Sequence, residues 1–282
     1  MIDTVIGLGQ AGCAIAEKFK EFPQYTCITI DSEGSPDYKI TRRKAVELYE
    51  EKTPKLIGLA KKTTQDILFI TSAGTISGAA LKILQQLHTA KKNINVLYIK
   101  PELHELLGTK KLQENMVFNV FQEYARSSVF KTLFLVDNAV LSGIIGNVSL
   151  KKYRNTMNDM IVNTIHMVNV FSHTEPLLQL NLDKPETANI GTFGVSQLEN
   201  NNIHLFFKLD STRQHVVYYG IPESKIETDT LLMSQIKKQA AAYNNVSYRV
   251  YSTQYDEVVA YCLAYATAIQ KNNTGLKKVL TK

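Results

Sequence analysis

Short apolar runs recur along the first half of the chain and are separated by polar and amphipathic stretches. Runs of about four to eight residues rich in Val, Ile and Phe are typical of buried strands. We expect strands at 4–6, 27–30, 66–70, 96–99 and 132–136. Helical spacing of apolar residues predicts helices at 14–22, 45–51, 55–62, 81–87 and 111–126. Strands that alternate with helices predict an α/β domain built on a parallel sheet.

A longer helical pattern follows and separates this domain from a region of different character. From Ser149 an apolar face continues for some two dozen residues. Beyond it we expect strands at 203–209, 216–220 and 246–251, and helices at 228–243 and 257–271. The expected fold is a parallel α/β domain joined by a long central helix to a smaller α+β domain. The predicted divisions are the α/β domain with the helix at 1–170, a connection at 171–194, the α+β domain at 195–271 and a polar tail at 272–282.

Composition and charge narrow the class of protein. Hydrophobic residues make up 44% of the 282 positions, enough for a packed core. The net charge of +6 comes from scattered basic pairs, and Trp is absent, so we expect solvated faces and no nucleic-acid platform. No apolar stretch approaches the roughly 18 residues of a membrane span. The first residues show no basic and apolar leader pattern, so we expect a cytoplasmic protein.

The cysteines give no sign of a metal centre. Cys13, Cys27 and Cys262 are odd in number and lack the spacing of metal ligands. We expect buried, reduced thiols and predict no metal site in the protein itself.

A glycine-rich loop follows the first predicted strand and opens the first predicted helix. It contains Gly9, Gln10, Ala11 and Gly12, and with Gly7 it matches the pattern G-x-G-x-x-G. Glycines allow backbone amides to approach a phosphate closely at the positive end of a helix. The second strand ends in Asp31, where an acidic residue would meet a ribose. The alternative is a tight strand-to-helix turn with no ligand.

A second loop of small and hydroxyl residues follows the strand at 66–70. Its members are Ser72, Ala73, Gly74, Thr75, Ile76, Ser77 and Gly78. A loop of this kind at the carboxyl end of a parallel strand and at a helix start is suited to a second phosphate. Two such loops in one sheet predict a polyphosphate ligand.

An acidic segment after the long helix is the third candidate for chemistry. Asp183 and Glu186 lie three residues apart, with Asn181 ahead of them and Pro185 between them. If Pro185 opens a helix, the two carboxylates could act together as acid and base groups on one rim. The alternative is a capping box, in which Asp183 caps that helix and Glu186 lies in its first turn.

Four separated segments, in order, resemble the tubulin/FtsZ family of GTP-dependent filament proteins. The first glycine loop is similar to the family's first phosphate loop, and residues 74–78 are similar to its signature loop. Asn138 follows a strand where the family's guanine-reading Asn lies, and Asn158 falls where the core helix supplies a second guanine contact. The segment with Asn181, Asp183 and Glu186 resembles the family's synergy loop. The resemblance covers roughly residues 1–195.

The resemblance implies a mechanism that two subunits share. Each subunit would bind GTP or GDP with Mg²⁺ in its first half, and subunits would assemble head to tail into a homopolymer. Asn181, Asp183 and Glu186 of one subunit would complete the hydrolytic site of the next. The phosphate loops offer hydrogen-bond donors but no convincing general base, which fits this division. The compact size suggests a divergent bacterial, plasmid or phage-type member, and no adaptor or cargo is indicated.

Departures from the family pattern keep two alternatives open. Ser72 and Ala73 replace leading glycines of the signature loop, and Ile76 replaces a central one, which favours a member that assembles without hydrolysing nucleotide. The segment between Asp31 and Asp66 lacks the family's Gly-Ala-Gly loop that senses the terminal phosphate. The other alternative is an NAD-binding Rossmann oxidoreductase, supported by Gly7, Gly9, Gly12 and Asp31.

Overall fold

The computed structural model describes residues 1–102, 106, 108–182, 187–198, 202–243 and 245–271. The predicted polar tail at 272–282, Asp183 and Glu186 lie outside the described residues. In chain order the elements are β1 (Thr4–Leu8), α1 (Gly9–Phe19), β2 (Thr26–Asp31), β3 (Tyr38–Lys39), α2 (Val46–Lys52), α3 (Leu59–Lys62), β4 (Asp66–Ser72), the 3₁₀ helix η1 (Thr75–Ala79), α4 (Ala80–Thr89), β5 (Asn93–Lys100), α5 (Thr109–Arg126), β6 (Thr132–Asp137), α6 (Asn138–Ile145), α7 (Leu150–Phe171), β7 (Leu178–Leu180), β8 (Ile190–Gln197), β9 (Asn202–Leu205), β10 (Thr212–Pro222), α8 (Glu223–Thr228), α9 (Leu232–Ala241), β11 (Val246–Thr253) and β12 (Val259–Ala266).

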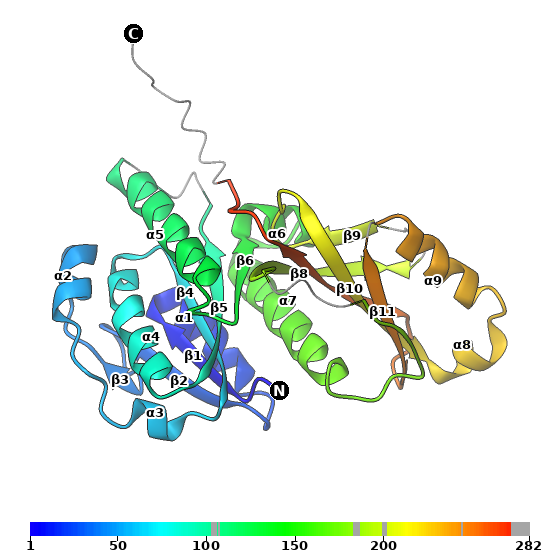
Figure 1. Ribbon diagram of the computed structural model, residues 1–282, viewed down its shortest axis with the longest axis horizontal. Coiled ribbons are helices and arrows are strands. Elements are labelled where there is room, and N and C mark those ends of the chain that lie inside the picture. The colour runs from blue at the N-terminus through cyan, green and yellow to red at the C-terminus, as the bar shows by residue number, and fades with distance from the viewer. Residues whose placement is uncertain (103–105, 107, 183–186, 199–201, 244, 272–282) are drawn as a thin grey trace, which may run out of the picture.

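The strands of the described residues form one mixed sheet in the order β3-β2-β1-β4-β5-β6-β8-β12-β10-β11-β7, with β9 paired to β8. The pairs from β3 to β8 are parallel, whereas β12 runs antiparallel to both of its neighbours, β8 and β10. Figure 1 shows the two halves side by side, with the parallel half carrying most of the helices. The predicted α/β fold with a smaller second part is confirmed. The exact domain boundaries stay predictions, since β8 joins the halves within one continuous sheet.

Helices cover both faces of the parallel half because its strands alternate their apolar side chains between two cores. Ile6, Phe69 and Tyr98 face one core, which α4 and α5 complete with Leu84 and Phe118. The neighbouring residues on the same strands face a second core, which α1 and α7 cover. Strands buried on both faces have near-continuous apolar sequences, which is why the first-half strands were predictable.

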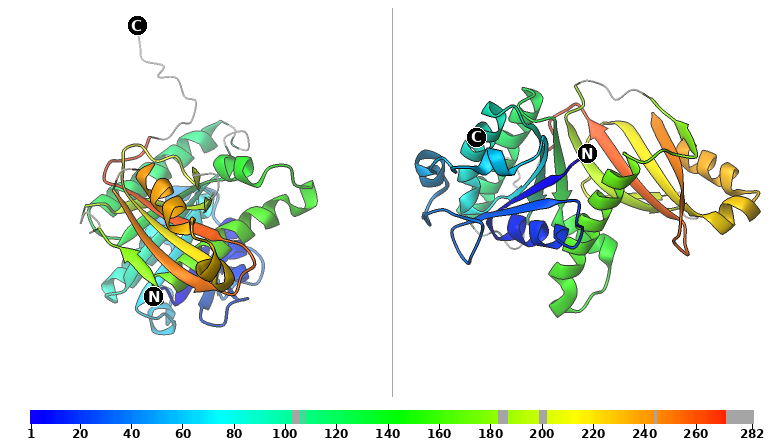
Figure 2. Two further views of the ribbon diagram at one scale, coloured as in Figure 1. Left: turned by 90° about the vertical axis from the view of Figure 1, so that its right-hand side faces the viewer. Right: turned by 90° about the horizontal axis from the view of Figure 1, so that it is seen from below.

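The long helix α7 runs from the carboxyl ends of the parallel strands to their amino ends (Figure 2). Near its start the Tyr153 hydroxyl donates to Glu102 Oε1 at 2.7 Å, just beyond the carboxyl end of β5. Near its end Asn169 Nδ2 donates to the carbonyl oxygen of Ile2 at 2.9 Å, ahead of β1. Its 22 residues span about 33 Å at 1.5 Å per residue. The helix therefore links the carboxyl edge of the parallel strands to their amino edge.

Three expected elements differ in the structure. The helix predicted at 257–271 is wrong, because β12 occupies the sheet between β8 and β10. Its alanines favour a helix, but Ala260 and Cys262 face one core while Leu263 and Tyr265 face the other, which is the two-residue period of a strand. The helix predicted at 55–62 is reduced to α3. The helix predicted at 228–243 is shortened to α9, and the separate helix α8 ends at Thr228.

The unpredicted strand β8 depends on its glycines. A Cβ on Gly191 would lie 2.9 Å from the carbonyl oxygen of Ala264, and one on Gly194 would lie 2.9 Å from that of His204. Neighbouring chains approach too closely there for a larger residue. Glycine is required by this close approach of the chains, although a glycine-rich segment in the sequence predicts a loop.

Candidate functional site

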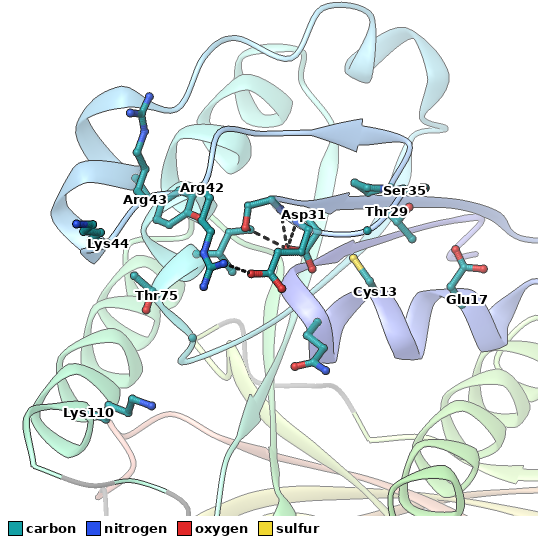
Figure 3. Close-up of a pocket in the computed structure, with 18 residues that line it drawn as sticks. Cys13, Glu17, Thr29, Asp31, Ser35, Arg42, Arg43, Lys44, Thr75 and Lys110 are labelled. Atoms are coloured by element: carbon teal, nitrogen blue, oxygen red, sulfur yellow. Dashed lines mark hydrogen bonds and ion pairs between the residues drawn. The ribbon is translucent and has the colours of Figure 1, made fainter.

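A cavity of about 1180 Å³ lies at the carboxyl end of the parallel strands (Figure 3). Its walls come from the start of α1, the loop after β2, the segment between β3 and α2, the turn before η1 and the first turn of α5. Among the predicted residues, Gln10, Asp31, Gly74, Thr75 and Ile76 line it. The two predicted phosphate loops therefore face the same space, which is large enough for a nucleotide.

The first loop forms the start of α1, which follows β1 directly with no turn between them. Gly9 begins the helix with φ +72°, a conformation that glycine adopts at no steric cost. Leu8 occupies the N-cap position and offers no side-chain cap, so the first-turn amides of α1 have no capping partner. Gln10 and Ala11 are exposed at this end. Uncapped amides beside a cavity are suited to an anion.

Gly12 has a packing role. A Cβ at Gly12 would lie 2.5 Å from the carbonyl oxygen of Ile70 in β4, so α1 packs closely against the sheet there. Gly12 is buried and does not line the cavity. The third glycine of the motif is therefore needed for close packing of the helix against the strand.

The second loop lines the cavity beside the first, because β4 pairs with β1. Ser72 Oγ donates to the carbonyl oxygen of Ile99 at 2.7 Å, and Gln113 Nε2 donates to that of Ala73 at 3.1 Å. These bonds fix the turn from which Gly74 and Thr75 face the cavity. Gly74 is the N-cap of η1 and, having no side chain, leaves the amides of that turn uncapped as well.

The remaining loop residues pack behind this wall. Ser77 Oγ is buried and has no hydrogen-bond partner in the described part of the chain. A Cβ at Gly78 would lie 2.1 Å from the carbonyl oxygen of Val46, so α2 rests directly on η1. Ile76 has no positive φ, so its replacement of a glycine imposes no backbone strain on the turn.

Asp31 lines the cavity but is engaged with its own loop. Its Oδ1 accepts hydrogen bonds from the amides of Ser32 at 2.6 Å and Glu33 at 3.4 Å. The next loop is held by Asp37, which accepts from the amide and hydroxyl of Thr29, each at 2.8 Å. Although burial opposes it, these hydrogen bonds from Thr29 leave the pKa of Asp37 lowered.

Sequence reasoning missed the basic wall of the cavity. Arg42, Arg43 and Lys44 line it from the segment before α2, and Lys110 lines it from the first turn of α5. Arg42 pairs with Glu33 at 2.9 Å. The run Arg-Arg-Lys was visible in the sequence but resembles an ordinary solvated face, and only the fold brings it into the same cavity as the glycine turn.

Cys13 also lines the cavity, yet its thiol is poorly reactive. Its Sγ lies 3.4 Å from the carbonyl oxygen of Gly7 and 3.5 Å from that of Ile30. Burial raises the pKa of Cys13 to about 11. The thiol is therefore protonated at neutral pH. Of the three thiols expected to be buried, Cys262 is buried, whereas Cys13 and Cys27 are half-buried.

The two predicted guanine-reading residues lie outside the cavity lining. Asn138 begins α6, directly after Asp137, whose Oδ1 caps that helix by accepting from the amide of Ala139 at 2.9 Å. Asp137 Oδ2 also pairs with Lys100 Nζ at 3.0 Å, and both side chains are largely buried. Asn158 lies on α7 beside Asp159, which forms an ion pair with Lys18 of α1.

Asn181 is distant from the cavity along the fold. It follows the edge strand β7, and its Oδ1 accepts from Arg249 Nε at 3.3 Å. The next amide, of Leu182, donates to Ser247 Oγ at 2.9 Å near the start of β11. Since β10 and β11 run in the same direction as β6 and β8, these contacts lie at the amino edge of the sheet. The cavity lies at the carboxyl edge.

Two further features bear on the class of protein. Within the described residues no group of three or more His, Cys, Asp or Glu side chains could hold a metal ion. In the same part of the chain no helix is both long and apolar enough to cross a membrane.

The fold is that of the tubulin/FtsZ-like proteins. Solved structures match this chain over nearly its whole length at low sequence identity. An FtsZ dimer from M. jannaschii matches with a TM-score of 0.67 and 13% identity, covering 99% of this chain and 94% of that one. A GTPγS-bound CetZ2 protofilament from Haloferax volcanii matches with a TM-score of 0.66 and 14% identity, covering 94% and 92%.

The TubZ of Bacillus thuringiensis serovar israelensis, in GDP-form protofilaments, matches with a TM-score of 0.67 and 15% identity, covering 94% of this chain and 84% of that one. No protein-family model and no curated protein matches the sequence. The similarity therefore lies in the fold, and the bacterial, plasmid or phage origin stays a prediction.

Proposed function

We propose that this protein binds GTP in the cavity and assembles head to tail into cytoskeletal filaments. Two uncapped helix starts and a basic wall face one space of nucleotide size, as a polyphosphate requires. The similar CetZ2 and TubZ structures are nucleotide-form protofilaments. In this proposal Gln10, Ala11, Gly74 and Thr75 hold the phosphates.

Guanine would be read outside the cavity lining, between the start of α6 and α7. Asn138 and Asn158 lie on these two helices, and α6 packs against α7. An Asn side chain both donates and accepts hydrogen bonds, as the guanine edge requires. Tyr153, on the first turn of α7, donates to Glu102, so its hydroxyl is already engaged.

The observation that carries head-to-tail assembly is the length and direction of α7. The helix separates the cavity edge from the edge that holds Asn181 by about 33 Å. Asn181 and Leu182 are fastened to β11 at that far edge. An acidic group supplied by Asp183 or Glu186 therefore reaches a cavity most directly when it belongs to the next subunit.

Hydrolysis would then be completed by assembly. Asn181, Asp183 and Glu186 of one subunit would orient and polarise the attacking water at the terminal phosphate bound by its neighbour. Mg²⁺, when bound with the nucleotide, would supply positive charge that stabilises the phosphoryl group during transfer. Because the described residues offer no metal cluster of their own, the nucleotide itself would provide most of the ligands that hold the ion.

The first experiment uses Gly74. Nothing lies within 4 Å of a Cβ built there, so Gly74→Glu introduces a carboxylate into the cavity without a steric conflict. We expect Gly74→Glu to abolish GTP binding and GTP-dependent pelleting, while the neutral Gly74→Gln of the same size retains most of both. Equal GTP binding by the two variants would contradict the phosphate assignment. Binding of NAD and not GTP by the wild type would favour the Rossmann alternative, whose strand order the parallel half shares.

The second experiment tests whether the acidic segment acts in trans. Asp183→Asn should bind GTP but release no phosphate, and Gly74→Glu should do neither. Mixed together, the two should regain phosphate release, since some junctions would join an intact cavity to an intact acidic segment. No recovery in mixtures that still form joint filaments would contradict catalysis in trans.

Assembly without hydrolysis remains the second candidate function, because Ser72 and Ile76 stand where the family has glycines. Ser72 is bonded to the carbonyl oxygen of Ile99, and Ile76 packs against the core, so the turn is fixed by contacts of its own. GTP-dependent pelleting with no phosphate release by the wild type would favour this function.

A further inference from the structure

We propose that Arg42 binds the terminal phosphate and thereby distinguishes GTP from GDP. This inference rests on the proposed function and assigns the role to a residue of the basic wall. The chain has no Gly-Ala-Gly loop between Asp31 and Asp66 to sense that phosphate through backbone amides. A guanidinium in the same segment supplies the contact through a side chain.

The Arg42 side chain is directed into the cavity. Figure 3 shows it reaching toward the loop that carries Asp31, on the same side as Thr75 of the glycine turn, whereas Arg43 extends away. Its Nη1 lies 2.9 Å from Oε1 of Glu33, which belongs to the loop after β2. A cation in this position lines the same cavity as Gln10 at the start of α1 and Thr75 of the glycine turn.

The present partner of Arg42 is easily exchanged. The side chains of Arg42 and Glu33 are 78% and 64% exposed, and an exposed ion pair contributes little to stability because water and salt screen it. A guanidinium also matches phosphate with two parallel hydrogen bonds to a more highly charged group. A terminal phosphate that enters the cavity therefore competes well for Arg42, whereas GDP lacks that group.

The segment that carries Arg42 is fixed to the phosphate turn on its other side. Four residues after Arg42, the carbonyl oxygen of Val46 at the start of α2 occupies the place of the Gly78 side chain, 2.1 Å from the position of a Cβ there. Only a glycine at 78 permits this contact. Arg42 is thus held between α2 and the loop after β2. When Arg42 exchanges Glu33 for the terminal phosphate, that phosphate becomes linked to α2.

The test compares affinities for GTPγS and GDP, measured by competition against a fluorescent guanine nucleotide. We expect Arg42→Gln to lower the affinity for GTPγS about tenfold while changing that for GDP less than twofold. Arg42→Lys should recover part of the loss. Glu33→Gln, which frees Arg42, should leave GTPγS affinity unchanged or higher. Arg126→Gln makes the same charge change at an exposed position outside the cavity lining and should alter neither affinity.

The outcomes separate this inference from the proposed function. If the wild type binds guanine nucleotides but Arg42→Gln lowers both affinities equally or neither, the assignment of Arg42 is wrong and nucleotide binding stands. An equal loss with Arg126→Gln would mean that general positive charge is responsible, which also overturns it. If the wild type binds neither nucleotide, both proposals fail. The unfolding midpoint without nucleotide should match the wild type, since Arg42 is mostly exposed.

Discussion

Gly9 and Ile76, from the two loops of the cavity, are in direct contact. A Cβ on Gly9 would lie 2.6 Å from Cγ2 of Ile76. Gly9 also has φ +72°, which a residue with a side chain adopts only with strain. The isoleucine that replaces a family glycine thus packs on the glycine that begins α1. It joins the two loops through an apolar contact at the cavity edge.

This contact predicts an energetic coupling between the two positions. Gly9→Ala should destabilise the protein by about 2 kcal/mol, from left-handed backbone strain and from the collision with Ile76. In an Ile76→Ala background the collision is absent, so the same change should cost about 1 kcal/mol less. Urea unfolding of the four proteins gives the cycle. An identical cost in both backgrounds would show that the two loops do not press on each other.

Gly12 should behave as a packing residue. Its Cβ would meet the carbonyl oxygen of Ile70 at 2.5 Å, and backbone on both sides leaves little room to relax. We expect Gly12→Ala to lower stability by about 3 kcal/mol without any nucleotide present. Ala11→Ser, one residue earlier and exposed, should change it by less than about 0.5 kcal/mol. Thermal unfolding measures both, and a stable Gly12→Ala protein would reopen a direct phosphate role.

The parallel half was predictable because its strands and helices carry local signals. Its strands are buried on both faces, and α7 keeps an apolar stripe for its whole length. The C-terminal half was harder, since β12 is rich in alanine and β8 in glycine, and only their central place in the sheet explains both. Local propensity favours a helix and a loop there, and tertiary contacts overrule it.

The part of the site that is built from backbone groups was predictable from the sequence. The two glycine loops come together because both follow parallel strands, and this much follows from their spacing. The position of Arg42 does not follow from the sequence, because it depends on how α2 packs against Gly78. Nor does sequence separate Gly9, at the cavity edge, from Gly12, inside the helix–sheet contact. Asp183 and Glu186 lie outside the described residues, so their role stays a prediction.

The buried pair of Lys100 and Asp137 gives a third prediction. Lys100 Nζ lies 3.0 Å from Asp137 Oδ2, with 5% and 14% of the two side chains exposed. Lys100→Met leaves the carboxylate buried without a cation and should cost about 3–5 kcal/mol of unfolding free energy. Adding Asp137→Asn removes the charge and keeps a helix-capping side chain, so at least about half of that loss should return.

The control for this prediction is the pair of Lys131 and Asp66, whose atoms are 4.0 Å apart and whose side chains are 64% and 25% exposed. Lys131→Met should change stability by less than about 1 kcal/mol. Urea unfolding at neutral pH compares all the variants. If the double variant is no more stable than Lys100→Met alone, the cost comes from lost packing around Lys100 and not from an unpaired charge.

His166 on α7 makes the link between the helix and the end of α1 sensitive to pH. Its ring stacks on Phe22 with centroids 3.8 Å apart, and its Nδ1 lies 3.2 Å from both Gln24 Nε2 and the Tyr25 hydroxyl. Burial lowers the pKa of His166 from its ordinary value of 6.5. These three neighbours are aromatic, amide or phenol groups, with no carboxylate among them to favour the charged ring.

The sign of the resulting pH dependence follows from proton counting. Between the lowered pKa of folded His166 and about 6.5, the unfolded chain binds more protons, so stability rises with pH and is lost as pH falls through this window. The lowered pKa of Asp37 acts separately, in a window below about pH 4. We expect the melting temperature of the wild type to fall between about pH 7.5 and 5.5. His166→Asn should be less stable throughout, because the stacked ring is lost, but its melting temperature should fall less over the same interval. An equal fall in both proteins would assign the pH dependence to other groups.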